Sequence, residues 1–216
     1  NWPNHPRCSS KFFYQMIGIN EYFSIDLNRE FNSIPHDLNL PFEDSSLYSE
    51  FDLVTNHGTS GLAFNIAEAY RTIHKLCKPG GLIITTDGLM SPYGYFTLDY
   101  KCMEGLAAAN NYKILYSSYV ITVGKTEHGS DLQFHLPLNR KILSCLDYKT
   151  LDTLRVYMVF KKQDDSDFYF PYEGQYLSKM HGHQGFNRLY YKNPPSYSYI
   201  PIFDGLKSVS VMDLLI

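Results

Sequence analysis

In several segments of this chain hydrophobic residues recur every three to four positions, which predicts helices with one buried face. The clearest segment is residues 62–78, where Lys75 and Lys78 come near the end, at which the helix dipole favours cations. Pro79 follows directly and ends the helix. In all, helices are predicted at residues 9–17, 62–78, 98–110 and 139–148.

Shorter apolar runs predict strands. Residues 51–55 and 82–86 are runs of the kind that parallel sheets bury on both faces, while residues 113–123 alternate in polarity. Because a helix separates the first two runs, we expect a right-handed crossover and a parallel pair. Strands are predicted at residues 21–26, 51–55, 82–86, 113–123, 154–160 and 168–170, the last pairing back on 154–160.

These elements predict an α/β protein with one domain, because 216 residues and 25.0 kDa provide for one substantial core. We assign residues 1–170 to this domain. Residues 171–216 are rich in Tyr, Gly and Pro and show no clear period, so we expect an irregular C-terminal tail there.

Composition narrows the classes of function. A net charge of −3 and a pI of about 6.2 provide no basic field for a nucleic acid, and no apolar run approaches the roughly 20 residues that span a bilayer. The four cysteines are widely spaced, and the N-terminal residues lack the apolar core of a secretory signal. We therefore expect a cytoplasmic protein that binds neither nucleic acid nor membrane.

Polar residues at the carboxyl ends of the predicted strands are candidates for ligand binding, because open α/β sheets bind ligands at that edge. Asp26 ends an apolar run, and a carboxylate there can accept both hydroxyls of a ribose. Asp37 and Leu38 place an acid beside an apolar residue, which suits the amine and the ring of adenine. Both acids are equally compatible with a purely structural role in a turn.

A more specific pattern joins residues 51–59, Phe-Asp-Leu-Val-Thr-Asn-His-Gly-Thr, to residues 76–84, Leu-Cys-Lys-Pro-Gly-Gly-Leu-Ile-Ile. Here the chain resembles the class I S-adenosylmethionine-dependent methyltransferase family, in which the first run leads to an active-site loop and Lys-Pro-Gly-Gly turns a helix into the fifth strand. The resemblance extends from about residue 26 to residue 87. It implies a Rossmann-like three-layer α/β sandwich with a mostly parallel sheet and a C-terminal antiparallel hairpin near residues 154–170.

The resemblance also implies S-adenosylmethionine as the cofactor. The family's acid after the second strand binds the ribose, the next acid and apolar residue border adenine, and the loop after residues 51–55 lies near the methionine part and the substrate. Asp52 and the Pro-Gly-Gly turn at residues 79–81 would be structural. The implied cofactor-binding residues are Asp26, Leu27, Asp37, Leu38, Asn56, His57 and Gly58.

The chain departs from the family pattern in two places. Members with this type of loop often carry Glu-His after Gly-Thr-Ser, whereas this chain has Gly61-Leu62. Nothing before Asp26 supplies the family's glycine-rich loop, so the sheet is expected to lack the first strand, which lies mid-sheet. Its absence would leave two strand edges unpaired, and we expect a piece of a longer protein or a rearranged sheet, unless residues 11–17 form a strand.

Other polar features are compatible with more than one role. His57 is a candidate acid–base group or a loop residue that holds backbone. His181 and His183 lack cysteines or acids at the usual spacing, so no metal site is predicted. The Lys161-Lys162 pair, followed by acids, predicts a solvent-exposed turn. The nineteen tyrosines would fill core and surface, or line a pocket for a sugar or an aromatic ring.

The sequence is compatible with functions of different classes. The first is methyl transfer from S-adenosylmethionine to a small-molecule or glycan acceptor, by direct displacement at the sulfonium carbon. The second is a non-catalytic methyltransferase-like interaction module with an incomplete cofactor pocket. A nicotinamide-dependent Rossmann enzyme shares the acid after the second strand, but the Lys-Pro-Gly-Gly turn and the terminal hairpin argue against it.

Overall fold

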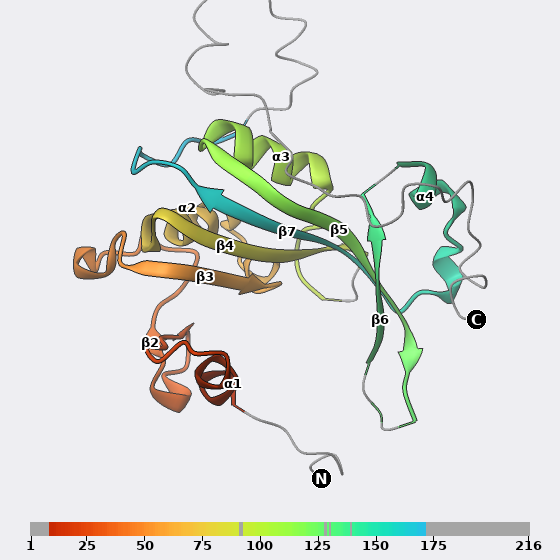
Figure 1. The fold of residues 1–216 in the computed structure, drawn as a ribbon, viewed down its shortest axis with the longest axis horizontal. Coiled ribbons are helices and arrows are strands. Elements are labelled where there is room, and N and C mark those ends of the chain that lie inside the picture. Colours follow the sequence, from red (N-terminus) through yellow and green to blue (C-terminus); the bar gives the residue numbers. More distant parts are fainter. Residues whose placement is uncertain (1–8, 91–92, 128, 130, 139, 172–216) are drawn as a thin grey trace, which may run out of the picture.

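The structure is a computed structural model that describes residues 9–90, 93–127, 129, 131–138 and 140–171. These residues form a mixed α/β fold (Figure 1). The helices are α1 (Ser10–Met16), α2 (Ile66–Leu76), α3 (Tyr100–Ala109) and α4 (Arg140–Cys145). The strands are β1 (Ile25–Asp26), β2 (Ile34–Pro35), β3 (Phe51–His57), β4 (Cys77–Met90), β5 (Tyr112–Lys125), β6 (Asp131–Pro137) and β7 (Thr153–Lys162).

The main sheet has five strands in the order β3-β4-β7-β5-β6, with α2 and α3 on the same side of it (Figure 1). Its core combines residues from both helices with the facing side of the sheet, since Tyr70 and Met103 pack in one cluster with Ile83, Val156 and Phe160. All four predicted helices are confirmed within a few residues, as are the strands at 51–55, 82–86, 113–123 and 154–160. Within the described residues, no helix combines the length and the apolar character needed to cross a bilayer.

The expected mostly parallel sheet is wrong in its balance of directions. Strands β3 and β4 form the predicted parallel pair, but β4–β7, β7–β5 and β5–β6 are all antiparallel. The physical reason is the position of β7. This strand comes last among the described strands and lies between β4 and β5, so two strands that run in the same direction are separated by one that runs the other way.

The expected hairpin between residues 154–160 and 168–170 is also wrong. Strand β7 already has a partner on each side, so its backbone groups are used by β4 and β5. Residues 163–171 form no strand, and Phe168 instead packs against the core. The unpredicted strand β6 supplies the antiparallel hairpin partner of β5. Its signal was present, because Leu132, Phe134 and Leu136 alternate with polar residues.

The Lys-Pro-Gly-Gly segment follows α2 and lies in the first residues of β4, where the pairing with β3 shifts in register between Phe51 and Leu53. Gly80 has a φ of +82°, which favours glycine. At Gly81 a Cβ atom would lie 2.9 Å from Cys77 Sγ and 2.9 Å from Lys78 O, so a side chain has no room. The predicted structural role of this segment is confirmed.

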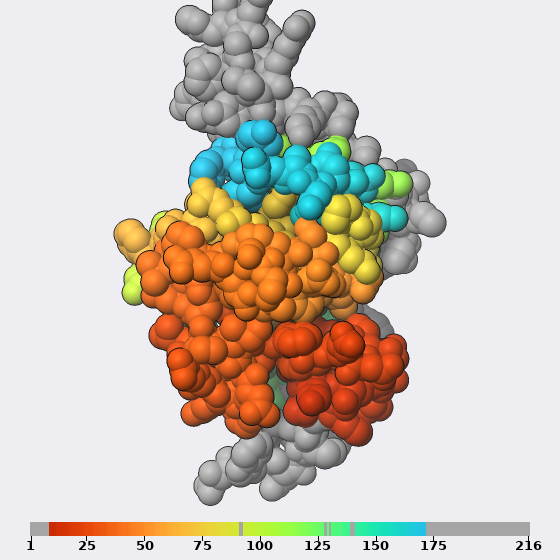
Figure 2. Space-filling view, turned by 90° about the vertical axis from the view of Figure 1, so that its left-hand side faces the viewer, coloured from red at the N-terminus to blue at the C-terminus, as the bar shows by residue number. Residues whose placement is uncertain are grey.

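The N-terminal residues form a separate small unit beside β3. The predicted strand at residues 21–26 shortens to β1, which pairs only with β2 and in parallel, while residues 10–16 form α1 and not a strand. In Figure 2 this red segment lies below the orange segment that contains β3. The ring centroids of Phe23 and Phe51 lie 5.5 Å apart, and Tyr14 Oη lies 3.1 Å from Thr55 Oγ1. Among the described strands, β4 is the hydrogen-bonded partner of β3, and β1 is not.

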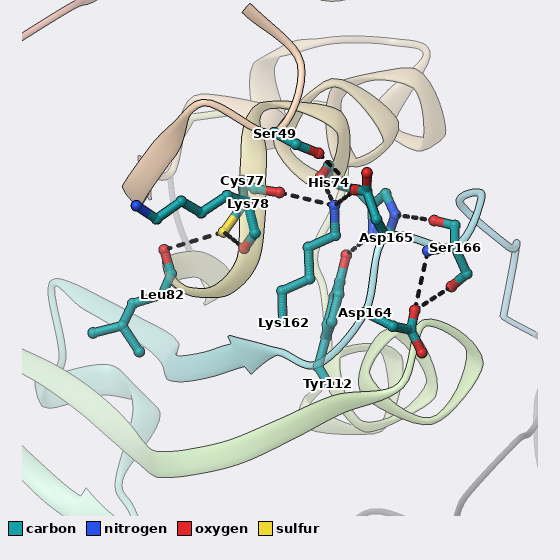
Figure 3. A network of polar contacts seen from close by, with 10 residues as sticks. All are labelled: Ser49, His74, Cys77, Lys78, Leu82, Tyr112, Lys162, Asp164, Asp165 and Ser166. Carbon is teal, nitrogen blue, oxygen red and sulfur yellow. Dashed lines mark hydrogen bonds and ion pairs between the residues drawn. The ribbon is translucent and has the colours of Figure 1, made fainter.

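Lys162 corrects the expectation of a solvent-exposed turn, because this side chain is 1% exposed (Figure 3). Its ammonium donates hydrogen bonds to His74 O at 2.9 Å and Cys77 O at 2.8 Å, and it pairs with Asp165 Oδ1 at 3.0 Å. His74 lies in the last turn of α2 and Cys77 is its C-cap residue, and backbone oxygens at such a helix end have no partner within the helix. Lys162 thus caps α2, while the neighbouring Lys161 is exposed as expected.

His74 belongs to the same network. Its ring nitrogens lie 2.6 Å from Tyr112 Oη and 2.7 Å from Ser166 O. Burial and the nearby charge of Lys162 lower the pKa of His74 from 6.5 to about 4. The histidine is therefore neutral at neutral pH, and it joins α2 to the segment that follows β7.

We expect Lys162→Met to lower the free energy of unfolding by about 2–3 kcal/mol, because two buried carbonyls lose their donor. The matched control is Lys161→Met, which changes the exposed neighbour and should stay within about 0.5 kcal/mol of the wild type. Urea denaturation measures both. Equal effects of the two substitutions would contradict the capping role.

His74 also predicts a dependence of stability on pH. Between the folded pKa of about 4 and the unfolded pKa of about 6.5, the unfolded chain binds one more proton at this site. The free energy of unfolding should therefore fall as the pH drops from 6.5 to 4, by up to about 3 kcal/mol. Urea denaturation across this range should show a shallower fall for His74→Gln, and identical slopes would contradict the account.

Candidate functional site

A buried carboxylate organises the carboxyl ends of β3 and β4. Asp87, which is 1% exposed, accepts hydrogen bonds from Tyr70 Oη at 2.5 Å, Ser60 Oγ at 2.6 Å and Thr85 Oγ1 at 2.8 Å. Hydrogen bonds to an ionised acceptor are about twice as strong as neutral ones, and they offset the cost of burying the charge. Burial, with the charge of Asp87 as a second cause, raises the pKa of Tyr70 well above 10, so this phenol remains a donor.

Asn56 is the last buried residue of β3 and joins the same network. Its Nδ2 donates to Ser60 Oγ at 2.7 Å and to Thr85 Oγ1 at 2.9 Å, and its Oδ1 accepts from the backbone N–H of Ser60 at 3.1 Å. The whole amide is therefore used inside the protein. This arrangement favours a role for Asn56 in holding the loop after β3, and not in direct contact with a ligand.

The loops after β3 and β4 are fixed against each other by two glycines. Tyr95 N donates to Gly61 O at 2.8 Å, and Gly94 adopts a φ of +94°. A Cβ atom at Gly94 would lie 2.9 Å from Gly61 O, which is backbone and cannot move aside easily. At Gly61 itself, a Cβ atom would find ordinary contact distances of 3.8 Å to Phe96 O and 3.9 Å to Asp87 Oδ1.

These loops expose an aromatic patch, which we define as Leu62, Phe64, Tyr95 and Phe96. Phe64 and Tyr95 are 72% and 70% exposed, and their ring centroids lie 5.7 Å apart. The ring centroids of Phe64 and Phe96 lie 5.9 Å apart. Because the patch lies on the fixed loops, its rings form a surface beside the Asp87 network that an apolar or ring-shaped ligand can contact.

Asp26 and Leu27 lie at the carboxyl end of β1. Asp26 is exposed, and its Oδ1 accepts a hydrogen bond from Asn28 N at 3.3 Å, as in an Asx turn. Leu27 is 73% exposed. Both side chains are accessible, and neither contributes to the described core.

Asp37 and Leu38 follow β2 and are half-buried. Asp37 Oδ1 accepts from Asn39 N at 2.9 Å and from Asn39 Nδ2 at 2.8 Å, and these bonds lower the pKa of this carboxyl. Asn39 in turn reaches the start of α2, where its Oδ1 accepts from Asn65 N at 2.8 Å. The structure therefore joins the 37–39 turn to the loop that follows β3.

His57 and Gly58 end β3. Gly58 has a φ of +87°, which explains glycine at this reversal. His57 is exposed on one side, and partial burial together with the positive charge of Arg155 lowers the pKa of its imidazole. His57 is therefore neutral at neutral pH and can accept a proton.

Two contacts show how the predicted site residues are arranged. Phe23, before β1, meets Phe51 at the start of β3, and Asn39, after β2, bonds Asn65 after β3. These contacts place the segment before β1 beside the start of β3, and the turn after β2 beside the start of α2. No described contact joins Asp26 directly to His57.

Sequence reasoning missed the centre of this site. The sequence pattern marks Asp87 only as the end of a strand, although an acid at the end of an apolar run is the same signal that singles out Asp26. The predicted absence of a metal site falls partly on His181 and His183, which lie outside the described residues. Among the residues that the structure does describe, no group of three or more His, Cys, Asp or Glu could hold a metal ion.

Comparison with known proteins shows little similarity. No protein-family model and no curated protein matches the chain. Among solved structures, the chain is similar to one titled "Crystal structure of MccD protein", with a TM-score of 0.33 and 11% sequence identity. That alignment covers 71% of this chain and 74% of the other. A likeness this distant assigns no family.

Gly94 and Gly124 provide a matched test of the loop contact. Both have positive φ, but a methyl group added at Gly94 would lie within 3 Å of backbone, whereas one added at Gly124 would have nothing within 4 Å. We expect Gly124→Ala to cost about 1 kcal/mol of stability from φ alone, and Gly94→Ala to cost at least about 2 kcal/mol. Urea denaturation measures both, and equal losses would show that the Gly61–Gly94 contact does not constrain the loops.

Proposed function

We propose that this protein transfers a methyl group from S-adenosylmethionine to a small-molecule or glycan acceptor. The observation that supports this proposal is the pair of hydrogen bonds between Asn39 and Asn65, which joins the turn after β2 to the loop that follows β3. Open α/β sheets bind their ligands at the carboxyl ends of the strands. In this proposal the turns that carry the two acids and the loop that carries His57 border the adenosine.

In this proposal the adenosine part contacts the first two turns. The exposed Asp26 accepts the ribose hydroxyls, with Leu27 beside the sugar. Asp37 uses only Oδ1 for Asn39, so Oδ2 is available to accept the exocyclic amine of adenine. The half-buried Leu38 borders the ring. Each of these assignments uses a group that the described contacts leave available.

The reacting part lies at the loop after β3. When bound, S-adenosylmethionine would supply a methyl group on a sulfonium, which the acceptor oxygen or nitrogen would displace, with the carbon–sulfur bond broken and the electron pair left on a neutral thioether. The acceptor's proton leaves to a base or to water. His57, neutral at neutral pH because its pKa is lowered, is the candidate for that base. Alignment of the two reacting atoms supplies most of the rate.

The aromatic patch supports an acceptor with a ring. Neither Leu62 nor the rings of Phe64, Tyr95 and Phe96 carry charge, and residues 58–65 contain no ionisable side chain. The apolar face of a sugar or of an aromatic ring can lie on such a surface. The acceptor would therefore bind between this patch and His57.

A non-catalytic interaction module is the second candidate. It is favoured by the same lack of ionisable side chains in residues 58–65, and by the internal use of the Asn56 amide. A module of this kind would keep the fold without binding the cofactor. Cofactor affinity therefore separates the two candidates.

Calorimetric titration of the full-length protein with S-adenosylhomocysteine tests the proposal. We expect Asp26→Ala to weaken binding by roughly 10- to 100-fold, because hydrogen bonds to a charged group contribute about 1.5–3 kcal/mol. The matched control is Asp52→Ala on β3, whose exposed carboxylate pairs with Lys78 and should not affect affinity. Equal affinity of Asp26→Ala and wild type would remove Asp26 from the site, and a wild type that does not bind would favour the module.

A further inference from the structure

The face of the main sheet opposite α2 and α3 carries two side chains of β7 that the proposed function does not use, Arg155 and Tyr157, and beside them His57 of β3. On β7, Leu154 and Val156 are buried in the core, so the alternation of a strand directs Arg155 and Tyr157 to the opposite face. Both are half-buried. His57, at the end of β3, lies in the same row of the sheet as Tyr157, with Thr86 of β4 between them.

The strand register sets the spacing of these groups, and Thr86, between His57 and Tyr157, is itself buried at 6% exposure. Arg155 pairs with Gly88 on β4, which has no side chain to cover the sheet there. His57 and Tyr157 lie two strands apart, which corresponds to about 10 Å between their backbones. A small ligand group would therefore lie over Gly88, where the long arginine side chain of β7 can reach it.

The hydrogen-bonding groups at this position are not used by described contacts. No hydrogen bond or ion pair within the described residues involves the guanidinium of Arg155, the imidazole of His57 or the hydroxyl of Tyr157. By contrast, Arg71 pairs with Glu68 and Lys78 pairs with Asp52. A half-buried cation without a partner is costly, and an anionic ligand would offset that cost.

Neighbouring side chains hold the Tyr157 ring in place. The centroid of this ring lies 5.9 Å from that of Tyr116 and 5.5 Å from that of His135, and both pairs are T-shaped. His135 Nδ1 lies 2.9 Å from Ser118 Oγ, which fixes the imidazole in turn. These residues of β5 and β6 form one side of the position and direct the tyrosine side chain without using its hydroxyl.

We propose that Arg155, together with Tyr157, binds an anionic group of the methyl acceptor, a carboxylate or a phosphate, beside the imidazole of His57. The guanidinium matches the two oxygens of such a group in a bidentate arrangement, and the phenol donates a further hydrogen bond. The proximity of Arg155 to His57 is supported by the lowered pKa of His57, to which its charge contributes after burial. The identity of the ligand as the acceptor rests on the proposed function, whereas anion binding itself does not.

Histidine NMR with inorganic phosphate as the probe tests this proposal at constant ionic strength. In the wild type, phosphate should shift the His57 signals saturably and raise the His57 pKa, because a bound anion favours the charged imidazole. We expect Arg155→Gln to weaken phosphate binding at least 10-fold, and Arg155→Lys to retain part of it. Lys161→Gln removes one positive charge from the same face of β7, at a distance, and should bind phosphate like the wild type.

Two results would overturn the anion site: a wild-type His57 signal that does not saturate with phosphate, or an unchanged response in Arg155→Gln with its fold intact by thermal unfolding. A second titration, in saturating S-adenosylhomocysteine, identifies the source of the anion. A phosphate response that persists supports the acceptor, and one that disappears assigns the position to the cofactor's carboxylate and overturns the acceptor assignment. If the protein does not bind S-adenosylhomocysteine but still binds phosphate, the proposed function fails while the anion site remains.

Discussion

The burial of Asp87 constrains the rest of the site. A carboxylate at the end of β4 with almost no exposure must be surrounded by donors, and its donors come from β3, β4, α2 and the loop after β3. The loop cannot move without removing Ser60 from the carboxylate. The positions of His57, Gly58 and the aromatic patch thus depend on an interaction that no ligand touches.

A second buried charge has the same effect at the other end of α2. Lys162 caps the last turn of that helix and pairs with Asp165, so β7 and α2 are joined by hydrogen bonds as well as by packing. Because β7 lies between β4 and β5, this contact also holds the centre of the sheet. Arg155 and Tyr157 are then presented from a strand that is fixed on both sides.

The elements with a strong periodic signal were predictable from the sequence. The period of α2, the apolar runs of β3 and β4 and the glycine pair at residues 80–81 depend on local physics, and the structure contains each of them. The position of β7 depends on long-range pairing, to which local patterns are insensitive, so the direction of most strand pairs and the terminal hairpin were predicted wrongly. Lys162 was misjudged for the same reason, because its partners lie more than 80 residues earlier in the chain.

The candidate site shows the same division. Single residues such as Asp26 and Asp37 could be nominated because an acid after a strand is a local feature. The sequence provided no sign that the Asn56 amide would be used internally, or that Arg155 would share a face with His57, because both depend on the register between strands. How these residues are used is a property of the folded sheet.

A crystal structure of the full-length protein with S-adenosylhomocysteine tests the central claim most directly. The account predicts an adenosine that contacts the turns after β1 and β2 and the loop after β3, with the ribose hydroxyls on Asp26 and the adenine amine on Asp37. A nucleoside bound on another side of the molecule would contradict it.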